Sequence, residues 1–335
     1  MEKVRWYLQW HITDNCNNDC IHCYNKGKRK TDEPTVAQFK EVLADFLEAC
    51  NEMGAYPHIA LIGGDPLLHP NFKEFVNILK DVPNLILQIA GNPETLTNEM
   101  IRFLLPHIAN FQVSLDGNRI IHDKFRYKGS FAATIDCLQR ASNMGMKMNV
   151  MSTISELNVH SIGEMINIVY SAGADKWTFA RYVPELGEKN NLTPKMMRVM
   201  MSKVLSVHNF LDKEISKKES FWNCFSPVEK NKDCKLISGC GLGTLSMSIL
   251  PDNTIMGCRR HAGSVLGKWE KKGDFIDKLL FHPILIKFRK VEKIKRCKDC
   301  VYLYSCRGCR AISYASSNGQ YFETDPSCSF FKSKE

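Results

Sequence analysis

The 335-residue sequence has no long hydrophobic run. No window approaches the roughly 20 apolar residues of a membrane-spanning helix, so we expect no membrane association. The N-terminal region has no cationic segment followed by an apolar core, so we expect no secretory signal peptide. These absences predict a cytoplasmic protein. In that compartment the 14 cysteines indicate metal ligation rather than disulfides.

The sequence also has no motif for nucleic-acid recognition, although its net charge is +9. Lys and Arg are concentrated in residues 213–298, with pairs such as Arg259-Arg260. This excess indicates a solvated basic face or a surface for an acidic partner such as a peptide segment. We therefore expect no nucleic-acid partner.

Three cysteines, Cys16, Cys20 and Cys23, directly follow an apolar run at residues 4–12 that predicts a buried strand. Their thiolates can converge on one soft metal centre. A closed zinc site needs four ligands, and no fourth Cys or suitably placed His follows within the next 25 residues. The site is thus one ligand short, as in a 4Fe-4S cluster with one open iron; a zinc knuckle or a redox pair is the alternative.

Short apolar runs alternate with amphipathic stretches up to about residue 210. Strands are expected at residues 4–12, 58–62, 85–90, 111–115, 146–154 and 177–182, and helices at residues 36–53, 71–79, 99–105, 131–144, 162–172 and 194–210. Parallel strands need crossover connections, and six units are too few to close a barrel of eight. The pattern predicts an α/β fold, an open partial (β/α)6 TIM-like barrel with functional loops at the carboxyl ends of its strands.

Glycines and polar side chains follow several of these strands. Gly63-Gly64-Asp65 comes after the second strand, where a glycine pair lets backbone approach a ligand closely or simply forms a common turn. Ser114, Asp116 and Arg126 follow the fourth strand. A hydroxyl, a carboxylate and a guanidinium can bind a ribose and an amino-acid carboxylate, although each alone is more often a surface residue.

Together with the cysteine loop, these strand ends resemble the radical S-adenosylmethionine (SAM) superfamily in the right order over residues 4–210. The resemblance implies that SAM chelates the open iron and that its reductive cleavage yields a 5′-deoxyadenosyl radical, which abstracts hydrogen from a substrate C–H bond. It places Cys16, Cys20 and Cys23 at the cluster, Gly63, Gly64 and Asp65 at the SAM amino group, Ser114 and Asp116 near the ribose or carboxylate, and His22 and Tyr24 near the adenine. Asp65 stands where the family usually has Glu, and Ala90-Gly91-Asn92 replaces the more usual Thr-Asn-Gly.

Eight further cysteines lie beyond residue 211, where the periodic units cease: Cys234, Cys240, Cys258, Cys297, Cys300, Cys306, Cys309 and Cys328. Alone, the run at residues 297–309 suits zinc or iron and sulfur equally. The full order resembles the SPASM extension of radical SAM maturases, which carries two auxiliary clusters, so we expect three 4Fe-4S clusters. The resemblance gives Cys234, Cys240, Cys258 and Cys309 to one auxiliary cluster and Cys297, Cys300, Cys306 and Cys328 to the other.

These patterns divide the chain into a barrel at residues 1–210, a bridging segment at residues 211–233 and a SPASM domain at residues 234–335. Residues 249–255 fit a hairpin with Asn253 in a left-handed turn. Cys50 and Cys137 lie on the inward faces of expected helices, where inert thiols are usual. Cys224 lies outside any regular pattern and is a candidate hydrogen-atom donor of the kind a peptide epimerase requires, or a packed thiol.

The favoured function is a maturase that forms a cross-link, thioether or epimer on a ribosomally made peptide. Both the cysteine-rich extension and the segment Arg181-Tyr182-Val183-Pro184 resemble such maturases. Only about fifteen residues precede the cysteine loop, so we expect leader recognition by a separate protein or by the basic C-terminal region. An external electron donor such as flavodoxin or ferredoxin is also expected.

Three alternatives remain. The first is a radical SAM enzyme acting on a small molecule such as a tetrapyrrole. The second is sulfatase maturation, in which the family has an acidic residue where Arg259 follows Cys258. The third is a non-catalytic zinc or electron-transfer protein.

Overall fold

The computed structural model describes residues 4–25, 32–188, 192–208, 214–216, 219–224 and 240–331. Its strands form one sheet in the order β10-β9-β8-β1-β2-β3-β4-β5-β6-β7. The strands are β1 (Arg5–Thr13), β2 (Tyr56–Gly63), β3 (Ile86–Ala90), β4 (Asn110–Ser114), β5 (Met148–Ile154), β6 (Lys176–Arg181), β7 (Glu214–Ser216), β8 (Ser246–Ile249), β9 (Thr254–Met256) and β10 (Val265–Lys268). Every pair from β8 through β1 to β7 is parallel.

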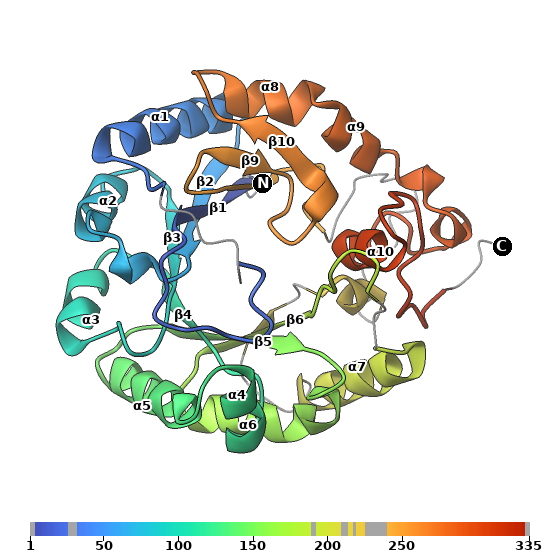
Figure 1. Cartoon of the computed structure of the whole chain (residues 1–335), viewed down its shortest axis with the longest axis horizontal. Helices are drawn as coiled ribbons and strands as arrows, with labels where there is room; N and C mark the ends of the chain where they lie inside the picture. Colours follow the sequence, from blue (N-terminus) through green and yellow to red (C-terminus); the bar gives the residue numbers. More distant parts are fainter. Residues whose placement is uncertain are drawn as a thin grey trace.

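Most helices surround the curved sheet on its outer side, while the last one lies among the C-terminal loops (Figure 1). They are α1 (Val36–Glu52), α2 (Phe72–Leu79), α3 (Asn98–Leu104), α4 (Arg119–Phe125), α5 (Ser130–Asn143), α6 (Ile162–Ser171), α7 (Pro194–His208), α8 (Asp274–Phe281), α9 (Pro283–Arg289) and α10 (Arg310–Ser316). The predicted partial (β/α)6 barrel is confirmed, with β1 to β6 in chain order. Within the described part of the chain, no helix is both long and apolar enough to cross a bilayer.

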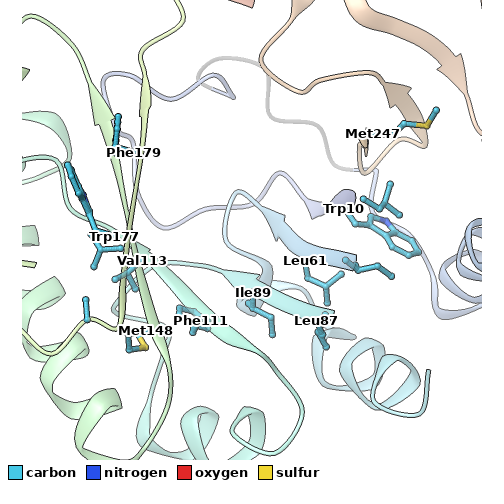
Figure 2. Packing of buried hydrophobic residues seen from close by; sticks show 14 of the residues in the cluster. Trp10, Leu61, Leu87, Ile89, Phe111, Val113, Met148, Trp177, Phe179 and Met247 are labelled. Atoms are coloured by element: carbon cyan, nitrogen blue, oxygen red, sulfur yellow. The ribbon is translucent and has the colours of Figure 1, made fainter. Parts of the chain in front are cut away.

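The main core lies between the sheet and these helices. A row of side chains in register crosses the strands, from Trp10 to Leu61, Ile89, Phe111 and Met148, and each is at most 1% exposed. Figure 2 shows these residues within the packed cluster. Because successive strand residues point to opposite faces, this row fixes which side chains face the inside of the barrel.

The inner face of the sheet is polar on most strands. The neighbours of the core residues include Gln9, Gln88, Gln112, Asn149, Thr178 and Ser248, together with the apolar Ala60, Ile62 and Ala90. Asn149 Nδ2 donates to Gln112 Oε1 at 3.1 Å, and Thr178 Oγ1 donates to Asn149 Oδ1 at 3.0 Å. Ser248 Oγ donates to Gln9 Oε1 at 3.3 Å. Amide and hydroxyl groups therefore line much of the interior, beside the aliphatic side chains of Ala60, Ile62 and Ala90.

The C-terminal part joins the same sheet. Strands β8 and β9 form the predicted antiparallel hairpin, and Asn253 has the expected left-handed conformation with φ 65°. Strand β8 pairs in parallel with β1, so the sheet runs across the expected division between residues 210 and 234. The Trp269 Nε1–H also bonds Asp45 Oδ2 of α1 at 2.8 Å. The domain limits themselves stay a prediction.

Candidate functional site

The cysteine loop leaves the carboxyl end of β1 and lies against the end of β2. Gly64 N–H donates to Thr13 O at 2.8 Å, and Asp65 N–H donates to Asn15 O at 2.7 Å. A Cβ on Gly64 would stand 2.2 Å from Asn15 O, so no larger residue fits there. The glycines thus allow a close approach of the chain that leads into Cys16. Their role toward the SAM amino group stays a prediction.

Two N–H donors, one from the loop after β3 and one from the C-terminal end of α4, reach the sulfurs of this loop. Asn92 Nδ2 lies 3.3 Å from Cys16 Sγ, and Arg126 Nη1 lies 3.6 Å from Cys20 Sγ. Burial raises the pKa of Cys20, which the Arg126 guanidinium opposes and the nearby Cys23 and Cys16 thiols reinforce. Asn92 was not predicted to be a site residue. In the sequence it stood out only as part of Ala90-Gly91-Asn92, which replaces the family's more usual Thr-Asn-Gly.

Asp116 is fully buried at the end of β4 and holds Arg126 in place. Its Oδ2 accepts from Arg126 Nε at 2.9 Å, and its Oδ1 accepts from Thr153 N–H at 2.8 Å. His22 Nε2 lies 3.9 Å from the same Oδ2. Burial raises the pKa of Asp116, but the Arg126 guanidinium and the two nearby imidazoles outweigh it and lower the pKa. Asp116 is therefore a positioning residue for Arg126, while a contact with ribose or carboxylate stays a prediction.

Asp65 is also buried, and its carboxylate accepts hydrogen bonds from the surrounding loops. It accepts hydrogen bonds from Leu67 N–H at 3.1 Å and from Thr95 Oγ1 at 2.6 Å. Burial raises the pKa of this carboxyl, although both hydrogen bonds oppose the rise. The side chain thus ties the end of β2 to the loop after β3, next to Asn92.

A small pocket brings several of these residues together. Its volume is about 220 Å³ including the part open to solvent, and its lining includes Asn18, Asn92, Ser114 and Arg126. His22 and Tyr24 are not among the described residues that line it. The ring of His22 packs edge-on against Phe125 at 5.0 Å, and Tyr24 is 41% exposed. Their predicted place near the adenine stays a prediction.

The C-terminal part contacts the cysteine loop through the arginine that follows Cys258. The Arg259 guanidinium lies 4.8 Å above the Tyr24 ring and donates a hydrogen bond to Asn25 Oδ1. Arg260 Nη1 donates to Arg181 O at 3.2 Å. Both residues are half-buried and their guanidinium groups contact the protein, so this pair contributes little to the basic face expected for residues 213–298.

The C-terminal cysteines gather in two places. Cys297, Cys300, Cys306 and Cys328 line one cavity of about 390 Å³, open part included, and Cys224 lines it too. Burial lowers the pKa of Arg260, but the Cys309 and Cys258 thiols, Glu219 and the Cys240 thiol raise it. Those three thiols therefore share one guanidinium as an electrostatic partner. Cys234 lies outside the described residues.

The donor sets fit iron and sulfur. Thiolates are the ligands of 4Fe-4S clusters, and N–H groups aimed at ligand sulfurs, like those of Asn92 and Arg126, orient and tune such centres. Among the described residues, no three or more His, Cys, Asp or Glu side chains are placed so that they could hold one metal ion. Cys50 and Cys137 are buried, and burial raises the pKa of each to about 12. They are packed thiols, as predicted.

Comparisons with known proteins agree with this geometry. Residues 10–169 match the model of the Radical SAM superfamily. The chain is 24% identical to the AdoMet-dependent heme synthase of Methanosarcina barkeri, over 98% of this chain and 97% of that protein. It is 23% identical to the mycofactocin maturase MftC of Mycobacterium ulcerans, over 92% of this chain and 83% of that one. Among solved structures, Streptococcus suis SuiB bound to precursor peptide SuiA has the same fold, with a TM-score of 0.76, 15% identity and coverage of 96% of this chain and 75% of that one.

Proposed function

The chain is a radical SAM enzyme, and from that premise we propose that it modifies a ribosomally made peptide by forming a cross-link, a thioether or an epimer. The observation that carries the peptide assignment is the polar inner face of the barrel, lined by residues such as Gln88, Gln112 and Asn149. An amide side chain offers both donors and an acceptor, which match the peptide group. The similarity to a protein named a maturase supports the same assignment.

Within this proposal, the residues of the chain bind and orient the cofactors. The chemistry that the cluster and SAM supply when bound is hydrogen-atom abstraction from an unactivated C–H bond. Cys16, Cys20 and Cys23 would hold the cluster. Asn92 and Arg126 would direct N–H groups at two of the ligand sulfurs.

The remaining strand ends would hold SAM. The backbone of Gly63-Gly64-Asp65 would receive its amino group. Ser114 lines the same pocket as Arg126 and would take its ribose or carboxylate.

Two further 4Fe-4S clusters complete the proposal, one in the cavity of Cys297, Cys300, Cys306 and Cys328. The other would be held by Cys234, Cys240, Cys258 and Cys309, of which the described ones interact electrostatically with Arg260. Full ligation by four thiolates favours electron transfer or structural stabilisation over substrate binding. Flavodoxin or ferredoxin would donate electrons, a separate protein would bind the peptide leader, and the enzyme would act in the cytoplasm.

A tetrapyrrole substrate is the second candidate function. One observation favours it, because the similarity to a heme synthase extends over 98% of this chain. A flat macrocycle needs mostly apolar pocket walls, whereas the described inner face of the barrel carries amide and hydroxyl groups. The peptide proposal therefore has the better geometric support.

The test compares both substrates directly. Purified enzyme would receive SAM and reductant with either the peptides encoded beside its gene or an iron porphyrin. We expect a mass change or an epimer in a peptide and none in the porphyrin. A Cys16→Ala, Cys20→Ala and Cys23→Ala variant is the control and should cleave no SAM. Modification of the porphyrin alone would contradict the peptide proposal.

A further inference from the structure

The cavity at the C-terminal end contains one thiol more than a 4Fe-4S cluster can use. Five cysteines line it: Cys224, Cys297, Cys300, Cys306 and Cys328. A cluster of this kind has four iron corners, each taking one thiolate. The extra cysteine is Cys224, which comes from the short helix Ser220–Cys224 rather than from the C-terminal cysteine run.

Cys224 is associated with one particular member of the set. It lines the same cavity as Cys306, and the interaction between the two thiols, together with burial, raises the pKa of Cys306 well above its usual value. The electrostatic partners of Cys297 are instead Arg310 and the three other cysteines of the predicted set, Cys328, Cys306 and Cys300. The Cys224 thiol is thus associated with Cys306, the predicted ligand of one iron of the cluster.

The protein fixes Cys224 there through its helix. Asn223 Nδ2 donates to the carbonyl oxygen of Ser305, directly before Cys306, at 2.6 Å. Phe221 packs on Phe330 at 5.2 Å, two residues after Cys328. Both contacts join the helix to the segments that carry cluster cysteines, so the position of Cys224 is built by its neighbours.

We propose that Cys224 is an alternative ligand for the cluster corner assigned to Cys306, so that either thiolate can hold that iron. In the exchange, the iron–sulfur bond to Cys306 breaks and one to Cys224 forms. The proton of the Cys224 thiol passes to the released Cys306 thiolate, and no electron is transferred. This inference depends on the proposed auxiliary cluster and assigns Cys224 a role different from hydrogen-atom donation.

The test measures iron content and the electron paramagnetic resonance (EPR) spectrum of the full chain, prepared anaerobically. Wild type is expected to hold about twelve irons. Cys306→Ala should keep nearly all of them, because Cys224 takes the vacant corner. Cys224→Ala should also keep them. The double variant should lose about four irons, roughly a third of the total, together with the signal of that cluster.

Matched controls distinguish the loss of a cluster ligand from a general effect of the substitution on folding. Cys297→Ala should lose about four irons even with Cys224 present, because the helix of Cys224 is held beside Cys306 through the Asn223–Ser305 hydrogen bond. Adding Cys50→Ala to Cys306→Ala should change nothing, since Cys50 is a packed thiol of α1. Far-UV circular dichroism and SAM cleavage by the first cluster would verify that every variant is folded.

Two results would overturn the inference. One is a loss of iron in Cys306→Ala as large as in the double variant, and the other is equal retention of iron in the double variant. A wild-type content of only about four irons would overturn the auxiliary clusters themselves, and with them the alternative ligand. The iron content of wild type therefore tests the proposed auxiliary clusters, and the iron content of the variants tests the role of Cys224.

Discussion

At the scale of single residues, the cysteine loop depends on two donors from distant positions. Asn92 donates to Cys16 Sγ, and its own N–H lies 3.4 Å from Asp65 Oδ2. Arg126 donates to Cys20 Sγ and is held by the buried carboxylate of Asp116. An N–H group aimed at a ligand sulfur stabilises the more negative, reduced state of a cluster. Both residues should therefore raise its reduction potential.

We expect Asn92→Leu to lower the reduction potential of the first cluster. The variant keeps the branching of the side chain but removes the N–H donor to Cys16. The expected shift is roughly 60 mV, the one-electron equivalent of ~1.4 kcal/mol, close to the lower limit for a hydrogen bond to a charged group. An EPR-monitored redox titration measures it, with Asn77→Leu on the exposed face of α2 as control. Equal potentials in variant and wild type would contradict this role.

The sequence allowed part of this site to be predicted. The cysteine spacing and the strand-end positions of Asp65, Ser114 and Asp116 are local features, so a single sequence displays them. The contact between Asn92 and Cys16 joins residues 76 positions apart, and no local pattern reports it. The ion pair between Asp116 and Arg126 was also not predictable. Residue types alone do not show whether a carboxylate faces a ligand or a neighbouring side chain.

At the scale of elements, β1 is held by aromatic packing. Trp10 stacks on Phe39 of α1 with ring centroids 4.1 Å apart, and Phe39 stacks on Phe75 of α2 at 4.1 Å. Helix α1 also has a capping box, in which Thr35 and Gln38 exchange side-chain and backbone hydrogen bonds. The strand that carries the cysteine loop is therefore fixed to two helices at once.

Phe39→Ala should lower the free energy of unfolding by roughly 3–5 kcal/mol, because it removes the middle ring of the stack and leaves a cavity. It should also reduce iron in the first cluster, since β1 positions the cysteine loop. Urea unfolding under anaerobic conditions and iron analysis measure the two effects. Met53→Ala, at the partly exposed C-cap of α1, is the control. A variant as stable as wild type would show that the stack contributes little.

Periodicity predicted the long elements well and the short ones poorly. Helix α1 and strands β1, β2 and β5 each have seven or more residues, enough for a repeating apolar pattern. Helix α4 and strand β7 were absent from the predicted fold. Strand β7 has only three residues, which complete too few alternations to show a period.

At the scale of the whole molecule, a buried cluster of ion pairs joins the barrel to the C-terminal part. Arg181 at the end of β6 donates from Nη2 to Glu219 Oε1 at 2.9 Å and to Asp325 Oδ2 at 2.7 Å. Burial lowers the pKa of Arg181, but the Asp325 and Glu219 carboxylates together outweigh it and hold the pKa well above its usual value. Asp325 also accepts from Cys309 N–H at 2.7 Å. One guanidinium thus links three parts of the chain next to a predicted cluster ligand.

Arg181→Met should destabilise the protein by roughly 3–5 kcal/mol, because it leaves two buried carboxylates without a counter-ion. The free energy of unfolding in urea measures this loss. Limited proteolysis should also cut the variant faster near residues 219–224. Lys73→Met is the contrasting variant, since Lys73 pairs with Glu99 in the solvent-exposed ion pair, and should leave the unfolding midpoint unchanged. Equal effects of both substitutions would refute a special role for the buried pair.

The order of β1 to β6 followed from the sequence, because crossover connections restrict how parallel strands can be arranged. The pairing of β8 with β1 did not, since it joins segments from opposite ends of the chain. The hairpin of β8 and β9 was predicted because its turn signal is local. Long-range pairing and side-chain networks therefore account for most of what the sequence left open.

That pairing has a consequence for how the protein is made. During synthesis, β1 leaves the ribosome first, but its neighbour β8, at Ser246–Ile249, is translated only after most of the polypeptide. Until then one edge of β1 offers unpaired N–H and C=O groups to any other nascent strand. Chaperone binding to the unfinished polypeptide should accordingly persist until β8 has been released from the ribosomal tunnel.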